Sequence, residues 1–131
     1  MNLKNAFRFQ NWLDALMTEA EERIKKHEDA QTMAKIMLRL LEEKEKIYVA
    51  CSNAKKKLDI DIDVQKTVNS KRYSVARLLN YSGLAEQAKA LSNKANECSD
   101  KIEMAILSTS VDYVEPFPFE TDLEEVIKLW K

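Results

Sequence analysis

The residues with the most directional hydrogen-bonding chemistry lie within one short polar stretch, at Asn69, Lys71, Arg72 and Tyr73. An arginine fork beside an amide and a phenol offers donors that suit an anionic ligand or a polar partner surface. The stretch is also unusually polar for a helix that packs in a bundle. Two interpretations therefore stay open: a binding site for a partner or an anion, and an ordinary exposed helix face.

A second group of candidate binding residues lies in the segment VDYVEPFPFE, residues 111–120. Its Tyr113, Phe117 and Phe119 are large apolar groups to leave in water. The prolines in this segment remove amide donors and push the preceding residues toward extended geometry, so no regular helix is expected here. We expect the segment to form a strap across the rest of the chain. The alternative is a peptide that docks on another chain.

Catalytic and metal chemistry is weakly supported. Nucleophilic catalysis needs a base beside a serine or cysteine, and His27 is the only imidazole in the chain. Cys51 and Cys98 each lie on an apolar stripe, as expected of small buried side chains. A single histidine makes no credible zinc site, and the chain carries no phosphate loop or dinucleotide fingerprint. We therefore expect no enzyme, no metal and no cofactor.

The stretch from Leu58 to Val64 alternates apolar and acidic residues, which taken alone is a strand pattern. It also resembles the opening of a calcium loop. However, Val64 stands where that loop needs glycine, and Ser70 stands where it needs glutamate. We expect an extended connector in which Asp61 or Asp63 caps the next helix.

Composition favours helices. The 131 residues include one glycine and two prolines, so tight hairpins between strands are poorly supported. The net charge is −1 and no strongly basic patch occurs, which makes a nucleic-acid partner unexpected. No apolar run approaches the length of a membrane span, and the N-terminus lacks the apolar centre of a signal peptide. A cytoplasmic location without membrane contact is expected.

The clearest predicted helix runs from Leu84 to Leu107. Apolar or small residues recur there at alternating steps of four and three, the spacing of one helix face. They are Leu84, Ala88, Leu91, Ala95, Cys98, Ile102 and Ala105. Because several of them are alanine, a neighbouring helix could approach closely.

Other stripes predict the remaining helices. Residues 3–26 and residues 30–58 carry stripes in nearly the same register, so residues 10–58 form either one long helix or a hairpin at residues 27–31. A third helix, at residues 64–81, is expected to bury its apolar side chains and to end before Gly83. These side chains are Val64, Val68, Val75, Leu78 and Leu79.

A short last helix follows the proline-containing segment. Thr121 is expected to cap it, with Glu124 completing a capping box.

Three segments resemble those of an uncharacterised family of small proteins from phages and prophages of Gram-positive bacteria. They are MNLKNAFRFQNWLDAL, LEEKEKIYVACSNAKKKLDIDIDVQKTVNSKR, and LSNKANECSDKIEMAILSTSVDYVEPF followed by DLEEVI. The resemblance implies that relatives carry extra sequence near residues 27–32 and 81–84. Insertions fall most easily in exposed turns, so the resemblance favours the hairpin at residues 27–31.

Together these observations predict an all-α protein, either an antiparallel helical bundle or an extended coiled-coil-like helical array, with a C-terminal strap and short helix. Residues 1–110 are expected to form the bundle domain, and residues 111–131 the acidic aromatic strap and helix packed on it. Long helices with exposed aromatic residues favour a homo-oligomer.

The expected function is that of a non-enzymatic, phage-type interaction protein. It would bind, and could inhibit, a host or defence component in the host cytoplasm, a role that the resemblance favours. One alternative is a small-molecule binder that sequesters a nucleotide signal at an oligomer interface through Asn69, Lys71 and Arg72. Another alternative is a structural component of a phage.

Overall fold

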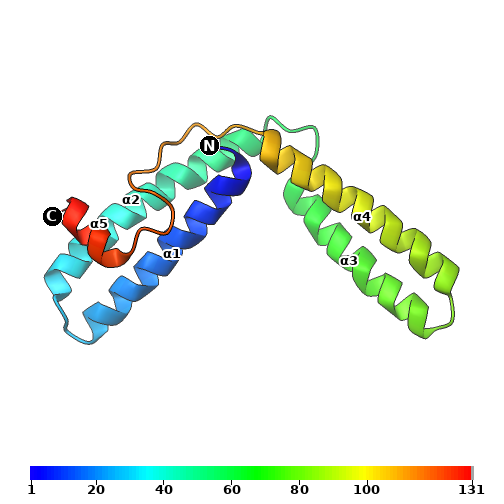
Figure 1. Cartoon of the computed structure of the whole chain (residues 1–131), viewed down its shortest axis with the longest axis horizontal. Helices are drawn as coiled ribbons and strands as arrows, with labels where there is room; N and C mark the ends of the chain where they lie inside the picture. Colours follow the sequence, from blue (N-terminus) through cyan, green and yellow to red (C-terminus); the bar gives the residue numbers. More distant parts are fainter. Residues whose placement is uncertain (131) are drawn as a thin grey trace. The chain divides into compact units, whose positions relative to one another are not determined.

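The computed structural model describes residues 1–130 and confirms an all-α fold (Figure 1). Its five helices follow the chain as α1 (Leu3–Lys25), α2 (Ala30–Lys55), α3 (Ile62–Tyr81), α4 (Ala85–Ser108) and α5 (Leu123–Trp130). Within the described residues, no helix has both the length and the apolar character needed to cross a bilayer.

The helices form two compact units. Residues 1–54 pack with residues 110–130, and we call this unit the strapped hairpin. Residues 55–109 form the second unit, which we call the inserted hairpin. The structure thus divides the chain differently from the expected boundary at residue 110. The division has this form because the chain leaves the first unit after α2 and returns to it after α4.

A tight turn joins α1 and α2, so residues 10–58 form a hairpin and not one long helix. His27 and Asp29 adopt positive φ angles of 57° and 53° there. The amide of Glu28 donates to the carbonyl of Arg23 and thereby satisfies one of the last carbonyls of α1. Lys44 of α2 donates to the carbonyl of Gln10 on α1 at 3.3 Å. Each of the two helices buries a row of side chains at helical spacing. These are Ala6, Phe9, Leu13, Leu16 and Ala20 on α1, and Met33, Ile36, Leu40, Ile47 and Cys51 on α2.

The segment from Val111 to Asp122 has no regular helix and lies on the same unit as α1 and α2 (Figure 1). The Phe117 ring lies 5.5 Å from that of Phe9 and 5.4 Å from that of Trp130, between ring centroids. The indole nitrogen of Trp12 donates to the carbonyl of Thr121 over 2.9 Å. We call residues 111–122 the strap, because these contacts bind it to α1 and α5.

Two caps fix the starts of α3 and α5. Asp61 accepts a hydrogen bond from the amide of Val64 at 3.1 Å, so the predicted cap of α3 is confirmed. The predicted Thr121 cap of α5 is wrong. Its hydroxyl donates to the carbonyl of Pro118, and Asp122 caps the helix by accepting from the amide of Glu125. Asp122, one residue later, takes the cap position because the Thr121 hydroxyl is already bonded to the Pro118 carbonyl in the turn.

The inserted hairpin consists of α3 and α4, which lie antiparallel along their length (Figure 1). Gly83 has φ 78°, and the amide of Leu84 donates to the carbonyl of Leu79 to end α3. The predicted α4 seam is confirmed, because Ala88, Ala95 and Ile102 are buried and Leu91, Cys98 and Ala105 are half-buried. Only Leu84, at its N-terminal end, is 44% exposed.

The face of α3 that packs on α4 differs from the predicted one. The buried residues of α3 are Ile62, Asn69 and Ala76, which are seven residues apart. The predicted inward residues Val64, Val68, Val75 and Leu78 are exposed, and Leu79 is only half-buried. The prediction is wrong because one neighbouring helix covers only one face of α3. That face is selected by polar contacts to α4 and not by the larger side chains.

Candidate functional site

Asn69 joins α3 to α4 through hydrogen bonds. Its side chain is 4% exposed, and its amide nitrogen donates to the carbonyl of Ala95 and to the hydroxyl of Ser99, each over 2.9 Å. Its amide oxygen accepts from a guanidinium nitrogen of Arg72 at 3.3 Å. Both ends of the amide are therefore used inside the hairpin. Asn69 contributes to the packing of α3 on α4 and presents no free donor to a ligand.

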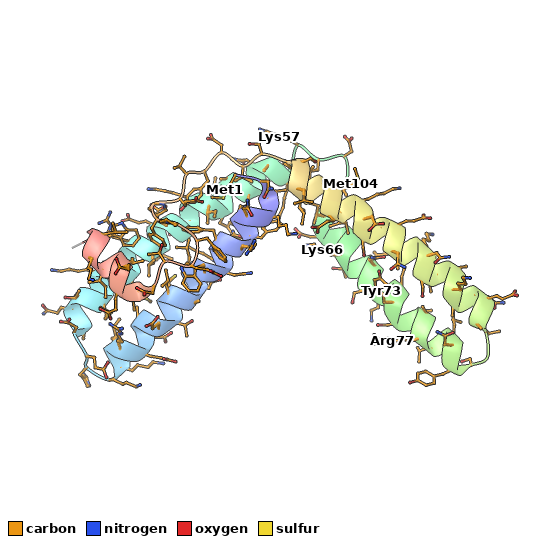
Figure 2. All side chains as sticks on the ribbon, viewed as in Figure 1. Met1, Lys57, Lys66, Tyr73, Arg77 and Met104 are labelled. Atoms are coloured by element: carbon orange, nitrogen blue, oxygen red, sulfur yellow. The ribbon has the colours of Figure 1, made fainter. Side chains whose placement is uncertain are left out.

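Tyr73 has a similar role one turn further along α3 (Figure 2). Its phenol donates to the side-chain oxygen of Asn96 at 2.7 Å and lies 3.3 Å from the hydroxyl of Ser99. The alanines of the α4 seam let the two helices lie close enough for the short Asn96 and Ser99 side chains to reach the phenol. Hydrogen bonds among Asn69, Tyr73 and Ser99 therefore join α3 to α4 in place of a wide apolar interface.

Lys71 and Arg72 point to different surroundings. Lys71 is exposed, whereas Arg72 is half-buried and lines a cavity beside α4. The four predicted residues of this stretch are thus not brought together in one site. Two of them pack against α4, one lines a cavity and one lies on the outer surface.

The outer surface of α3 carries an apolar row that α4 leaves uncovered. Val64, Val68, Val75 and Leu78 are 52%, 41%, 43% and 63% exposed. With Lys71 they are spaced by alternating steps of four and three, as in the contact seam of a coiled coil. We call these five residues the α3 outer face.

This exposed row matters because the core of the inserted hairpin is small. Its buried apolar side chains are Ile62, Ala76, Ala88, Ala95, Ile102 and Ile106, half of them alanine. A core of alanines removes little apolar area from water. The α3 outer face carries larger side chains than much of that core, so covering it would add substantially to the stability of the hairpin.

The predicted strap residues are engaged within the strapped hairpin. Phe117 is 3% exposed, and the ring of Tyr113 lies 6.1 Å from that of Phe9. Phe119 is 37% exposed and packs at the edge of Trp12, with the guanidinium carbon of Arg8 4.7 Å from its ring centre. The strap therefore packs in cis, and of the three aromatic residues Phe119 presents the most surface.

A hydrogen bond from the Tyr113 phenol to Glu43, 2.6 Å long, fastens the strap to α2. Burial, and then this bond to Glu43, raise the pKa of Tyr113 well above its ordinary value. A raised folded-state pKa means that the contribution to stability is complete below about pH 10, the unfolded value, and is lost as the pH rises above it.

Tyr113→Phe is therefore expected to lower the free energy of unfolding by about 1–2 kcal/mol at pH 7, because it leaves the partly buried Glu43 carboxylate without its phenol donor. The difference from the unsubstituted protein should shrink above pH 10. Urea unfolding at pH 7, 9 and 10.5, measured on both proteins, tests this expectation. A difference that stays constant across these pH values would show that the hydroxyl contributes no proton-linked stability.

Sequence reasoning missed the outer position of the α3 valines. One signal was present: Ile62, Asn69 and Ala76 share a seven-residue spacing and therefore lie on one helix face. The prediction followed side-chain size, which favoured Val64 and Val68. Within residues 1–130, the structure groups no three histidine, cysteine or acidic side chains that could hold a metal ion.

The chain matches no protein-family model, no curated protein and no solved structure.

Proposed function

We propose that this is an interaction protein that binds another protein through the α3 outer face. The observation that supports the proposal is the row of exposed valine and leucine side chains at coiled-coil spacing on a hairpin with a small core. An amphipathic helix of the partner would lie along α3, on the side away from α4, and supply a third helical layer. Paired amphipathic helices use apolar anchors at such spacing.

The apolar side chains supply the affinity in this proposal. Fully burying a valine or leucine side chain contributes about 1.5–3 kcal/mol relative to leaving it in water. The four apolar residues of the α3 outer face are already partly buried, so each contributes a fraction of that amount. Their sum favours a complex most when the partner helix is ordered in advance, because less ordering entropy is then lost on binding.

Lys71 favours a partner that differs from this chain. In an antiparallel pair of α3 helices, with Val64 facing Leu78 and Val68 facing Val75, Lys71 would face Lys71 of the second copy. Two ammonium groups in one apolar seam repel each other and would be costly to desolvate. A partner helix that carries an aspartate or glutamate at the facing position would instead form an ion pair. We therefore infer a different protein with an acidic residue amid an apolar stripe.

The resemblance to proteins of phages and prophages supports a bacterial host or defence protein as this partner. Binding alone would be sufficient for an inhibitory role, because a helix laid across a partner's own interface excludes its usual contacts.

Site-specific photo-crosslinking in Gram-positive cells tests the proposal. A benzophenone amino acid replaces Val75 on the α3 outer face, or Asn93 on the exposed surface of α4 as the matched control. We expect an adduct with a different protein at position 75 and none above background at position 93. Val68→Asp should reduce the yield of this adduct at least tenfold, because it places a carboxylate in the seam, and Lys71→Glu should reduce it by reversing the charge.

Two outcomes would contradict the proposal. Equal labelling at positions 75 and 93 would show that the α3 outer face is not a preferred contact. An adduct at twice the mass of this chain, with no other product, would identify a second copy as the occupant. Lys71→Ala provides an internal check, since it is expected to increase such self-pairing.

A further inference from the structure

An open cavity of about 320 Å³ lies on the surface of the inserted hairpin, on a side of α3 other than the α3 outer face. It is lined by Ile60 of the connector, by Gln65 and Arg72 of α3, and by Lys94, Glu97, Cys98, Lys101 and Ile102 of α4. Ligand pockets of proteins begin at roughly this size. The cavity is large enough for a small organic molecule.

The side chains that line the cavity carry a net positive charge. Arg72, Lys94 and Lys101 line it against one carboxylate, that of Glu97. Among residues 1–130, none of these three cations lies within ion-pair distance of an acidic side chain. This is unusual for a chain with slightly more acidic than basic residues. Three neighbouring cations without carboxylate partners repel one another, and a bound anion would remove that repulsion.

Two polar side chains in the cavity, Arg72 and Gln65, also have hydrogen-bond donors that remain available. The Arg72 guanidinium uses one donor on Asn69, and this bond orients the remaining donors. Gln65 accepts from the Cys98 thiol at 3.7 Å through its side-chain oxygen, so its amide nitrogen remains available. An oriented arginine fork with two lysine point charges suits a tetrahedral dianion better than a single carboxylate.

The remaining lining residues add an apolar surface. Ile60 is half-buried and Ile102 is 7% exposed, so a small carbon surface lies beside the cations, with the larger share from Ile60. A ligand with an organic body can bury that body against them while its anionic group meets Arg72. Inorganic phosphate would leave this surface uncovered.

We propose that this cavity binds a phosphomonoester of about the size of a mononucleotide, with the phosphate held by Arg72, Lys94 and Lys101 and the organic body against Ile60 and Ile102. This site is separate from the α3 outer face and does not depend on the proposed protein partner. It also differs from the set of Asn69, Lys71 and Arg72 expected from the sequence, since only Arg72 belongs to both.

Isothermal titration calorimetry of the full chain, at low salt, tests the proposal with AMP, UMP and 1-naphthyl phosphate as probes. Adenosine and inorganic phosphate are the two partial ligands. We expect at least one phosphomonoester to bind with a dissociation constant below 1 mM, and at least tenfold more tightly than either partial ligand. The binding should weaken as sodium chloride is raised, because salt screens the cations.

Paired substitutions separate this site from a general attraction of anions. Lys94→Gln combined with Lys101→Gln should weaken binding at least tenfold, because the two substitutions remove two positive charges and their hydrogen-bond donors to the phosphate. Glu97→Gln should strengthen binding severalfold by removing the only carboxylate. Lys71→Gln removes the same charge from a neighbouring position outside the cavity and should leave the affinity unchanged.

Three results would overturn the proposal. The first is the absence of binding by all three phosphomonoesters at millimolar concentration. The second is equal affinity for inorganic phosphate, which would mean that the organic body makes no contact. The third is equal weakening by Lys71→Gln and by the Lys94 and Lys101 pair, which would indicate non-specific attraction. Circular dichroism of each variant confirms that the helices are intact, so loss of binding is not mistaken for unfolding.

Discussion

Replacing Phe117 by alanine is expected to lower the free energy of unfolding of the strapped hairpin by about 3–5 kcal/mol, the range for removing a buried phenylalanine. Phe117 is 3% exposed and lies between Phe9 of α1 and Trp130 of α5. The substitution would leave a cavity bordered by both rings, and the strap has no helical hydrogen bonds of its own to resist the loss. Detachment of α5 together with the strap is the expected route of unfolding.

Phe119→Ala is the matched control for this prediction. Phe119 lies two residues further along the same strap but is 37% exposed, and its contacts are an edge contact with Trp12 and a cation–π contact with Arg8. Its loss should cost only about 1–2 kcal/mol, since each aromatic or cation–π contact contributes about 0.5–1.5 kcal/mol.

Urea unfolding monitored by tryptophan fluorescence measures both effects. Trp12 and Trp130 are the only tryptophans in the chain, and both lie in the strapped hairpin, so the signal reports that unit alone. If the two variants lost similar stability, the strap would be held by its ends and not by the Phe117 contact.

In this chain, the sequence predicts where helices form more reliably than which faces of those helices pack together. The seam of α4 could be predicted because every position in it is apolar or small, which leaves one possible buried face. The hairpin at residues 27–31 could not be chosen from the stripes alone, because those on its two sides run in nearly the same register and allow one long helix; only the resemblance favoured the turn. Periodicity determines the α4 seam, and it is present in the residues themselves.

The buried face of α3 could not be predicted in the same way. Periodicity gives two competing faces, one with valines and one with Ile62, Asn69 and Ala76. The choice between them depends on α4, because the Ala95 carbonyl and the Ser99 hydroxyl can satisfy an amide only when α4 lies against Asn69. This information is tertiary. The cavity lined by Arg72 has the same origin, since three of its charged residues come from α4.

Asn69 thus determines which side chains of the inserted hairpin are exposed to solvent. By fixing the polar face inward, it leaves the valines of α3 outward and orients Arg72 at the edge of the cavity. A buried polar residue that selects one packing arrangement over another is a known device in coiled coils. The proposed partner face and the proposed anion cavity both depend on this one side chain.

Asn69→Asp is accordingly expected to unfold the inserted hairpin at neutral pH. The carboxylate would replace the amide donor that faces the Ala95 carbonyl and the Ser99 hydroxyl, so an anion would be buried against a carbonyl oxygen. Burying a charge without its partners costs roughly 3–5 kcal/mol. A hairpin with half of its buried apolar residues alanine has little stability with which to offset that cost. The Arg72 guanidinium, at the edge of the site, would compensate only part of it.

Asn96→Asp is the control, because it makes the same chemical change on the exposed side of the same interface. Asn96 only accepts a hydrogen bond there, from the Tyr73 phenol, and a carboxylate accepts equally well. Hydrogen exchange followed by mass spectrometry should show lost protection across α3 and α4 in Asn69→Asp but not in Asn96→Asp, with tryptophan fluorescence unchanged in both. Equal protection in the two variants would mean that Asn69 does not select the packing of α3. Another interaction would then have to explain why the valines of α3 are exposed.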